Sequence, residues 1–439
     1  MGKYFGTDGF RGTYGKELCD NHAYKIGRFL GAYKNETPAR VIIGKDTRES
    51  GDNLEKALID GLVFAGANCY LLGITTTPCV AYAVRNGDFD FGIMISASHN
   101  PYYDNGIKII NGQGEKIDEP LIYKIEEFLD QEIMPADKKE GRVLEYKIGI
   151  ENYKKYLINA SNRNFSGLRV GIDTSNGSAY KIAGEVFKAL GAEVYMINNT
   201  PNGKNINLSC GSTNIGALCS FVKEKGLDLG FAFDGDADRC IGVDSQGNEV
   251  DGDKIMYILA CNLKARGELR GNLVVTTVMS NMGLYEALSK IGVGYTQTRV
   301  GDYYVSEEIK RGDFSLGGEQ SGHIILSKYA PSGDGILTAL KVTEAILDSG
   351  KGLDELSGEI VPYFQETRSA PTNDKEKTMS SAKVKAAIEK AQIELEGDGR
   401  ILVRPSGTEP TIRIMVESKS REKGQKILSY IYNIVESEA

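Results

Sequence analysis

Three stretches of the sequence repeat one order of elements, and this order constrains the fold more than any other feature. Each stretch begins with a short apolar run, passes through a polar or glycine-rich turn into a segment with helical periodicity, and ends in a second apolar run. Strand, helix and strand within about 30 residues form a βαβ unit with parallel strands. The stretches cover residues 41–72, 168–195 and 273–295. We therefore expect an α/β protein with three similar α/β domains, built on mixed sheets around a cleft.

The pattern changes after residue 366. The segment Arg368–Lys377 is polar and lacks periodic apolar residues, which predicts a linker. A helical stretch, two strands and a final amphipathic helix follow it and predict a small α+β C-terminal domain. The predicted domains cover residues 1–152, 153–255, 256–366 and 367–439.

Three carboxylates alternate along a short loop that follows an apolar strand predicted at 229–233: Asp234, Asp236 and Asp238. Open α/β sheets bind ligands at the carboxyl ends of their strands. Because like charges repel one another, this spacing favours a bound cation, and hard oxygen ligands select Mg²⁺ or Ca²⁺. An EF-hand is excluded, since Arg239 stands where it needs glycine and Ser245 where it needs glutamate. A DxDx[TV] phosphatase motif fails because Asp238 occupies its Thr/Val position.

A serine follows another predicted strand, in the segment Ile95–Pro101. Ser98 lacks the flanking glycines of a hydrolase nucleophile elbow, and the three histidines of the chain suggest no triad, so an acyl-enzyme is not expected. A serine hydroxyl can instead accept a phosphoryl group, whose charge of nearly −2 would bind a metal. Lys108 could act as general base if burial lowers its pKa. Its other interpretation is an ordinary surface lysine.

Two further motifs contain groups that can bind a phosphorylated sugar. In Gly317–His323, the carboxylate of Glu319 and the hydroxyl of Ser321 can bond to adjacent sugar hydroxyls, although the segment alone equally fits a glycine-rich turn. The segment Arg404–Pro410 combines an arginine, two hydroxyls and a glycine-exposed amide, with Arg413 nearby, and predicts a phosphate nest. It lacks the Lys-Ser/Thr ending of a P-loop, so nucleotide binding is not expected.

Charge and cysteine content restrict the partners and the compartment. The net charge of −8 disfavours nucleic-acid binding, which depends on lysine and arginine. The seven cysteines form no CxxC pair and are odd in number, as expected of reduced thiols. We find no signal segment at the N-terminus and no apolar run near the ~18 residues that span a membrane. We therefore expect a cytoplasmic protein with neither a nucleic-acid nor a membrane partner.

Taken together, the motifs resemble the α-D-phosphohexomutase superfamily along essentially the whole chain. The segments that resemble it are, in order, the N-terminal Phe-Gly-Thr-Asp-Gly-Phe-Arg-Gly at 5–12, the Ser98 loop, the Asp234 loop, 318–323 and 404–410. The opening Phe-Gly-Thr-Asp-Gly and Gln320 point to the glucosamine branch of the superfamily.

The resemblance implies a role for each candidate residue. Lys108 would be the catalytic base, Arg11 and Arg239 would stabilise the transferring phosphoryl group, and His323 would assist proton transfer. The implied ligands of one Mg²⁺ are Ser98, in its phosphorylated form, with Asp234, Asp236 and Asp238. The implied substrate-binding residues are Gly301, Glu319, Ser321, Arg404, Ser406, Gly407, Thr408 and Arg413.

The implied reaction interconverts glucosamine 6-phosphate and glucosamine 1-phosphate, for amino-sugar nucleotide and cell-wall precursor synthesis. It would pass through a phosphoserine and a 1,6-bisphosphate of a hexosamine or hexose, in a homodimer. A phosphomannomutase or phosphoglucomutase shares this chemistry and differs in the sugar, and Tyr303, where the family commonly has arginine, leaves that alternative open. A phosphatase would not need Ser98, and a protein that only binds sugar phosphates would not need Ser98, Lys108 and the aspartates together.

Overall fold

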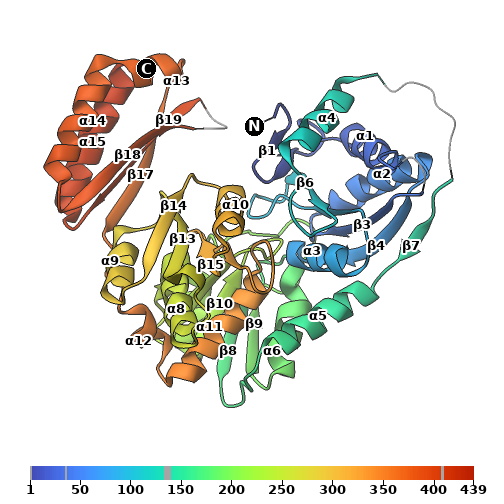
Figure 1. The fold of residues 1–439 in the computed structure, drawn as a ribbon, viewed down its shortest axis with the longest axis horizontal. Coiled ribbons are helices and arrows are strands. Elements are labelled where there is room, and N and C mark those ends of the chain that lie inside the picture. The colour runs from blue at the N-terminus through green and yellow to red at the C-terminus, as the bar shows by residue number, and fades with distance from the viewer. Residues whose placement is uncertain (1, 35–36, 133–139, 407–409) are drawn as a thin grey trace. The chain divides into compact units, whose positions relative to one another are not determined.

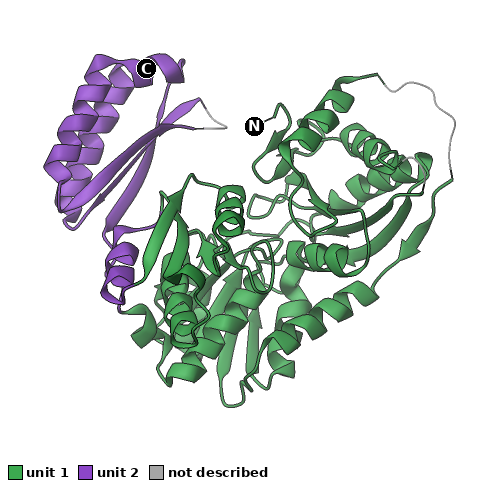
Figure 2. Ribbon diagram, viewed as in Figure 1, with its two compact units in different colours: residues 1–279, 293–358 green, residues 280–292, 359–439 purple. Residues whose placement is uncertain are grey.

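The computed structural model describes residues 2–34, 37–132, 140–406 and 410–439. The chain forms two compact units, which are described separately (Figure 2). Unit 1 contains residues 1–279 and 293–358, and unit 2 contains residues 280–292 and 359–439.

The first sheet of unit 1 is mixed and has the strand order β1-β2-β6-β5-β3-β4-β7. Its strands are β1 (Phe5–Gly6), β2 (Gly9–Thr13), β3 (Arg40–Lys45), β4 (Asn68–Ile74), β5 (Phe91–Ile95), β6 (Asp104–Asn111) and β7 (Val143–Glu145). The helices of this region are α1 (Asp20–Gly31), α2 (Gly51–Phe64), α3 (Thr77–Asn86), α4 (Glu119–Asp130) and α5 (Ile148–Ala160). The βαβ unit predicted at 41–72 is β3-α2-β4, with β3 and β4 parallel.

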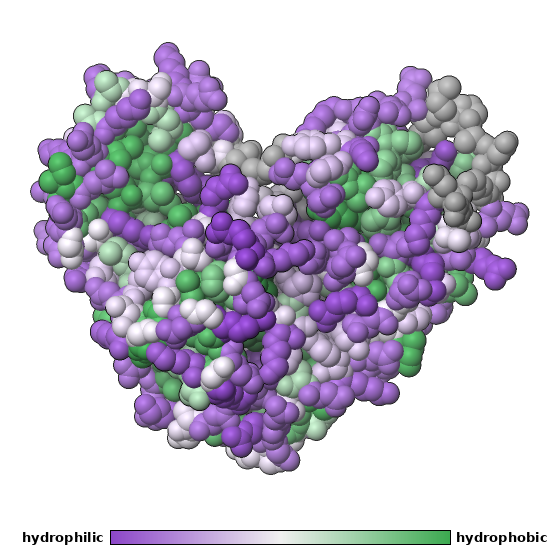
Figure 3. Space-filling view, in the orientation of Figure 1, coloured by the Kyte–Doolittle hydropathy of each residue, from purple (hydrophilic) through white to green (hydrophobic). Residues whose placement is uncertain are grey.

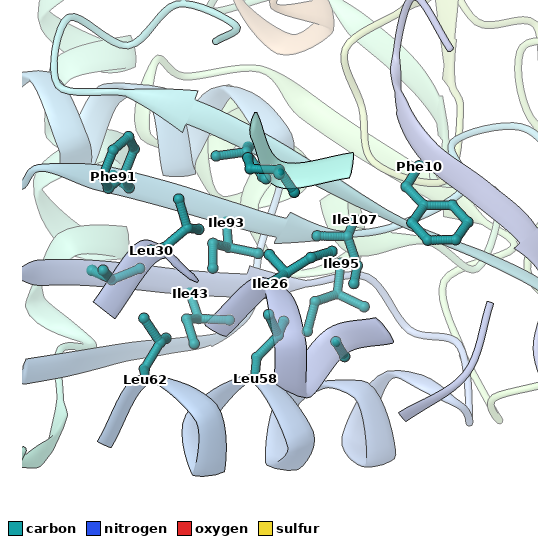
Figure 4. Close-up of a cluster of buried hydrophobic side chains, with 14 of the residues drawn as sticks. Phe10, Ile26, Leu30, Ile43, Leu58, Leu62, Phe91, Ile93, Ile95 and Ile107 are labelled. Carbon is teal, nitrogen blue, oxygen red and sulfur yellow. The ribbon is translucent and has the colours of Figure 1, made fainter. Parts of the chain in front are cut away.

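Alternate residues of β3 face different layers of helices. Ile43 packs with residues of α1, α2 and α4 (Figure 4). Ile42 packs instead with residues of α3 on the other face of the sheet. Figure 1 shows these helices beside β3. Helices α1 and α2 approach so closely that a Cβ atom added to Gly61 would lie 2.1 Å from the Tyr24 carbonyl oxygen. Glycine is therefore required at this crossing.

The second sheet has the order β12-β11-β10-β8-β9. Its elements are β8 (Arg169–Asp173), η1 (Ser178–Tyr180), α6 (Ile182–Ala189), β9 (Glu193–Ile197), α7 (Gly216–Lys225), β10 (Leu229–Phe233), β11 (Cys240–Asp244) and β12 (Glu249–Val250). Strand β10 covers the residues predicted for it and lies parallel to β8 and antiparallel to β11. The three aspartates therefore follow the carboxyl end of a central, fully buried strand.

The third sheet has the order β14-β13-β15-β16. The elements of this region are α8 (Gly252–Ala265), η2 (Arg270–Asn272), β13 (Leu273–Thr277), α9 (Met282–Lys290), β14 (Gly294–Thr298), α10 (Asp302–Gly312), β15 (Leu316–Gly318), β16 (Ile324–Leu326), α11 (Gly335–Ser349) and α12 (Leu353–Ser357). The predicted third βαβ unit is β13-α9-β14, and its helix belongs to unit 2.

Unit 2 has an antiparallel sheet in the order β17-β19-β18. Its remaining elements are β17 (Phe364–Pro371), α13 (Lys375–Ser380), α14 (Ala382–Leu395), β18 (Gly399–Pro405), β19 (Thr411–Ser418) and α15 (Arg421–Ser437). The linker predicted at Arg368–Lys377 is wrong, because β17 and α13 cover most of it. Strand β17 lies at the sheet edge with only Ala370 buried, so it lacks an apolar pattern that the sequence could reveal.

The three mixed sheets and the small α+β unit confirm the predicted fold class. Hydrophilic residues cover much of the face seen in the space-filling view, with hydrophobic residues in patches between them (Figure 3). Within the described residues, we find no helix with both the length and the apolar character needed to cross a bilayer.

Candidate functional site

Ser98 lies in the loop that follows β5, and its side chain is buried. Its φ angle is +53°, a left-handed conformation that is uncommon for serine. The Ser98 Oγ donates a hydrogen bond to Asp234, which lies 136 residues further along the chain. The fold therefore brings the candidate nucleophile into contact with the aspartate loop.

The three aspartates form a compact, buried cluster. Each offers a carboxylate oxygen that lies within 4.8 Å of the other two. Burial, and then the charges of Asp238 and Asp236, raise the pKa of Asp234 well above its usual range. Within the described residues, Asp236 Oδ1 and Asp238 Oδ1 are buried without a hydrogen-bond partner. Clustered hard oxygens with unused acceptor capacity are suited to a divalent cation.

Lys108 extends from β6 into the same cluster. Its Nζ lies 2.7 Å from Asp236 Oδ2, 3.2 Å from Asp238 Oδ2 and 2.9 Å from Asp8 Oδ2. Burial by itself lowers the pKa of Lys108, but the charges of these three carboxylates outweigh it and hold the pKa well above its usual range. Lys108 is thus buried, which excludes the interpretation as a surface lysine, but its pKa is raised and not lowered as the base interpretation required.

Two arginines lie close to the aspartate cluster. Arg11 forms an ion pair with Asp8, and the Arg239 backbone N–H donates to Asp234 Oδ1 at 3.2 Å. The Nε atoms of both arginines are buried without a hydrogen-bond partner among the described residues. Burial, and then the charges of Arg239 and Arg11, lower the pKa of His99 to about 4, so this histidine is neutral at pH 7. The positive charges of Arg11 and Arg239 favour an anion beside the Ser98 hydroxyl.

A cavity of about 400 Å³ in unit 1 opens beside these groups. Its lining residues are Thr7, Asp8, Arg11, Asp238, Arg239, Thr277, Met279, Val300, Gly301, Asp302, Glu319, Gln320, Ser321 and His323. The Gly301 N–H donates to Glu319 Oε1 at 3.1 Å, which joins two of the predicted sugar-binding segments. The sequence-predicted residues of unit 1 therefore lie at or beside one cavity, large enough for a small ligand.

His323 is buried between two carboxylates at this cavity. Its Nε2 accepts a hydrogen bond from the Gly333 N–H at 3.0 Å, and its Nδ1 lies 3.8 Å from Asp238 Oδ2. Burial by itself lowers the pKa of His323, but the carboxylates of Asp238 and Asp302 outweigh it and raise the pKa to about 9. Since Nε2 accepts from Gly333, the proton that Asp238 favours is on Nδ1.

Sequence reasoning missed an ion-pair network at the edge of the site. Lys116 Nζ lies 2.7 Å from Asp8 Oδ1 and 2.5 Å from Asp302 Oδ2, and it donates to the Thr7 carbonyl at 3.0 Å. This network connects the N-terminal segment to the segment that contains Gly301. Asp8 belongs to the N-terminal motif, but no local pattern indicates the role of Lys116.

The predicted phosphate nest belongs to unit 2. Arg404 and Arg413 are paired across β18 and β19, and burial, followed by the charge of Arg413, lowers the pKa of Arg404. Ser406 is buried and its N–H donates to the Thr411 carbonyl at 2.9 Å. The predicted residues Gly407 and Thr408 lie outside the described residues.

A serine hydroxyl on an oxygen-rich cation site, with arginines beside it, is typical of enzymes that transfer phosphoryl groups. Four domain families match the chain in order. They are the Phosphoglucomutase/phosphomannomutase alpha/beta/alpha domains I, II and III, at residues 2–135, 149–247 and 251–364, and the Phosphoglucomutase/phosphomannomutase C-terminal domain, at residues 368–434. The chain belongs to this family, within the α-D-phosphohexomutase superfamily.

Curated relatives specify the branch. A phosphoglucosamine mutase of Lachnospira eligens is 51% identical over 100% of this chain and 99% of its own length. One from Bacillus licheniformis is 46% identical over 100% of this chain and 99% of its own length. These relatives agree with the predicted glucosamine branch, and the chain is an enzyme of the isomerase class.

Solved structures share the fold. A phosphoglucomutase/phosphomannomutase family protein from Burkholderia thailandensis matches with a TM-score of 0.82 at 22% identity, over 100% of this chain and 98% of that one. An N-acetylphosphoglucosamine mutase from Aspergillus fumigatus, in complex with GlcNAc-6P and magnesium, matches with a TM-score of 0.72 at 16% identity, over 99% of this chain and 96% of that one.

Proposed function

We propose that this enzyme interconverts glucosamine 6-phosphate and glucosamine 1-phosphate through a phosphorylated Ser98. The observation that carries the proposal is the contact between the Ser98 hydroxyl and the aspartate cluster, with Lys108 and two arginines beside it. PhosphoSer98 would donate its phosphoryl group to the free O1 of glucosamine 6-phosphate. The resulting 1,6-bisphosphate would turn over in the site and return its 6-phosphoryl group to Ser98, which leaves glucosamine 1-phosphate.

Different residues of unit 1 would carry out proton transfer and phosphoryl binding in this reaction. In the first transfer, Lys108 would take the proton of the sugar hydroxyl that attacks phosphoSer98. In the second transfer, it would return a proton to the sugar oxygen whose bond to phosphorus breaks. Arg11 and Arg239 would bind the oxygens of the transferring group. His323 would hold Asp238 through Nδ1–H and assist proton transfer.

We propose Mg²⁺ as the cation of Asp234, Asp236, Asp238 and phosphoSer98. When bound, it would supply positive charge to the transferring group and offset the carboxylates that raise the pKa of Lys108.

Residues at the cavity would recognise the sugar, and residues of unit 2 would bind its phosphate. Glu319, Ser321 and the Gly301 segment would contact sugar hydroxyls. The non-reacting phosphate would be bound by Arg404, Ser406, Gly407, Thr408 and Arg413. Two adjacent arginines, one with a lowered pKa, support this assignment, because an anion would relieve their repulsion.

The names of the curated relatives support glucosamine as the sugar. The predicted domains at 1–152, 153–255, 256–366 and 367–439 are part of the proposal; the first three sheets each lie within one of them, whereas the boundary at 366 divides β17 of the fourth sheet. So are a homodimer and a cytoplasmic location, the latter supported by an odd number of cysteines, seven, with no CxxC pair among them.

The proposal is tested by the choice of sugar. Enzyme with Mg²⁺ and a trace of hexose 1,6-bisphosphate is given glucosamine, glucose or mannose 6-phosphate, and each 1-phosphate is followed by ³¹P NMR. The fastest conversion is expected for glucosamine 6-phosphate. A preference for glucose or mannose would overturn the assigned sugar but keep the mechanism, whereas release of inorganic phosphate without isomerisation would overturn both.

Replacing Lys108 by methionine should lower kcat by about 10²–10⁴-fold, the usual contribution of a general base. The wild-type kcat should rise with pH as Lys108 loses its proton, and the variant should lack this dependence. Lys116→Met is the matched control, since both lysines contact Asp8 but only Lys108 reaches the aspartate cluster. Equal losses in the two variants would mean that the shared contact with Asp8, and not proton transfer, explains the effect.

Replacing Arg404 by glutamine should raise KM for the sugar phosphate by about 10–100-fold, because a charged hydrogen bond to an anion contributes about 1.5–3 kcal/mol. Steady-state kinetics on the variant measure this change. A variant with unchanged KM would contradict the phosphate-binding role of the β18–β19 arginines.

A further inference from the structure

The turn after β3 binds the backbone of the Ser98 loop through one arginine. Arg48 is 3% exposed, and its Nε donates to Asp46 Oδ2 at 2.9 Å. The other guanidinium N–H groups donate to four backbone carbonyls, three in the loop and one at the start of β6. Nη2 donates to those of Ser98 and Asn100, each at 2.9 Å, and Nη1 donates to that of Asp104 at 2.9 Å and to that of Pro101. All five donors of this planar group are thereby used.

An asparagine from the second sheet region binds two of the same carbonyls. Asn207 Nδ2 donates to the Ser98 carbonyl at 2.8 Å and to the Asn100 carbonyl at 3.0 Å. The Ser98 and Asn100 carbonyls therefore each accept hydrogen bonds from two side chains that come from different parts of unit 1.

Further contacts fix these two segments to each other. The Thr47 hydroxyl donates to the Asn176 carbonyl at 2.6 Å, and the Glu49 N–H donates to the Gly203 carbonyl at 3.1 Å. A Cβ atom added to Gly235 would lie 2.5 Å from the Ser98 carbonyl oxygen, so the aspartate loop packs directly against this loop. The position of the Ser98 loop relative to Asp234 is thus set by both regions.

The conformation of Ser98 explains why such support is needed. A φ of +53° is unfavourable for a residue with a side chain, so it persists only when its surroundings impose it. The Ser98 N–H is also held, since it donates to Ser96 Oγ at 2.9 Å, and Ser96 in turn donates to Asp46. Rotation of this backbone would turn Oγ away from Asp234.

We propose that Arg48 and Asn207 are positioning residues that hold Ser98 in the geometry needed for phosphoryl transfer. This inference rests on the proposed role of Ser98 as the phosphorylated group. Neither residue lines the substrate cavity, so both act through the Ser98 loop. Their loss should slow transfer to and from Ser98 and leave substrate binding nearly unchanged.

Asn207 offers the cleaner test because it is only partly buried. Its φ is +58°, a conformation that glycine and aspartate tolerate, so Asn207→Gly and Asn207→Asp remove the donor with little backbone strain. We expect Asn207→Asp to lower kcat by about 100-fold, the cost of an ångström-scale misplacement, with KM changed by less than about threefold. The rate at which glucose 1,6-bisphosphate phosphorylates Ser98, measured by intact-protein mass, should fall by the same factor as kcat.

Asn205→Asp is the matched control, since the Asn205 side chain contacts the Asn202 N–H and the Thr200 carbonyl instead of the Ser98 loop. It should keep kcat within about threefold of the wild type. Arg48→Lys retains the charge but cannot reach all four carbonyls, and it should show the same loss in kcat as Asn207→Asp.

Asn207 variants with wild-type kcat and phosphorylation rate would overturn this inference, as would a rise in KM that accounts for the whole loss. If the wild-type enzyme isomerises its substrate without ever carrying phosphate on Ser98, the proposed function itself fails.

Discussion

Replacing Ser98 by alanine is expected to lower kcat by at least about 10⁴-fold, as the loss of a nucleophile does in enzymes that act through a covalent intermediate. The variant lacks the hydroxyl that donates to Asp234 and so lacks the proposed acceptor for the phosphoryl group. The variant should also gain no mass on incubation with glucose 1,6-bisphosphate, whereas the wild type should gain one phosphoryl group. Both effects are measured on the same protein, by ³¹P NMR and by intact-protein mass.

Ser96→Ala is the control for this prediction. Ser96 lies two residues earlier and is equally buried, but its hydroxyl accepts from the Ser98 N–H and donates to Asp46. This variant should still be phosphorylated and should remain at least about 100 times more active than Ser98→Ala. Isomerase activity that survives in Ser98→Ala would contradict the phosphoserine mechanism, whatever the control does.

The main features of the fold and of the site were predictable because each has a local pattern. The apolar strand at 229–233 followed by alternating aspartates, and the serine after the strand that ends at Ile95, identify two loops at strand ends. Their mutual contact follows from the resemblance of the whole chain to one superfamily, since no spacing within the chain predicts a bond across 136 residues.

What was missed has no local pattern. Arg48, Asn207 and Lys116 are single polar residues in turns and loops, and their partners are backbone carbonyls or carboxylates remote in sequence. The segment Arg368–Lys377 resembles a linker although it contains the end of β17, because an edge strand with one buried residue is stabilised by pairing with β19 and not by an apolar face. In both cases the determining interactions are long-range.

Replacing Asp234 by asparagine is expected to lower kcat by at least about 10³-fold while raising the melting temperature of the Mg²⁺-free protein. Asp234 is the member of the cluster without an ion pair to Lys108, which contacts Asp236 and Asp238. The substitution therefore removes a repelling charge without unpairing the lysine. A rise of a few degrees is expected, since about 1 kcal/mol shifts the midpoint of a domain of 150–250 residues by about 2–4 °C.

The matched control is Asp173→Asn in the same sheet region. Asp173 is also buried, but its carboxylate accepts hydrogen bonds from the Ser175 and Gly211 N–H groups and from the Asn198 side chain. Loss of an acceptor there should lower the melting temperature, and Mg²⁺ should raise the melting temperature of this variant by the same amount that we expect for the wild type. A lower melting temperature for Asp234→Asn in EDTA would contradict the argument from repulsion.

The dependence of the melting temperature of Asp234→Asn on pH and Mg²⁺ distinguishes repulsion among the aspartates from other causes. The pKa of Asp234 is raised in the folded state by burial and by the charges of Asp238 and Asp236, so folding disfavours its ionised form. Its contribution to stability is complete below the unfolded pKa of about 3.9 and is lost as the pH rises through the folded pKa. The advantage of Asp234→Asn in EDTA should therefore grow from acid to neutral pH. Saturating Mg²⁺ should reverse it, because in the proposed metal site the cation would bind three carboxylates in the wild type and two in the variant.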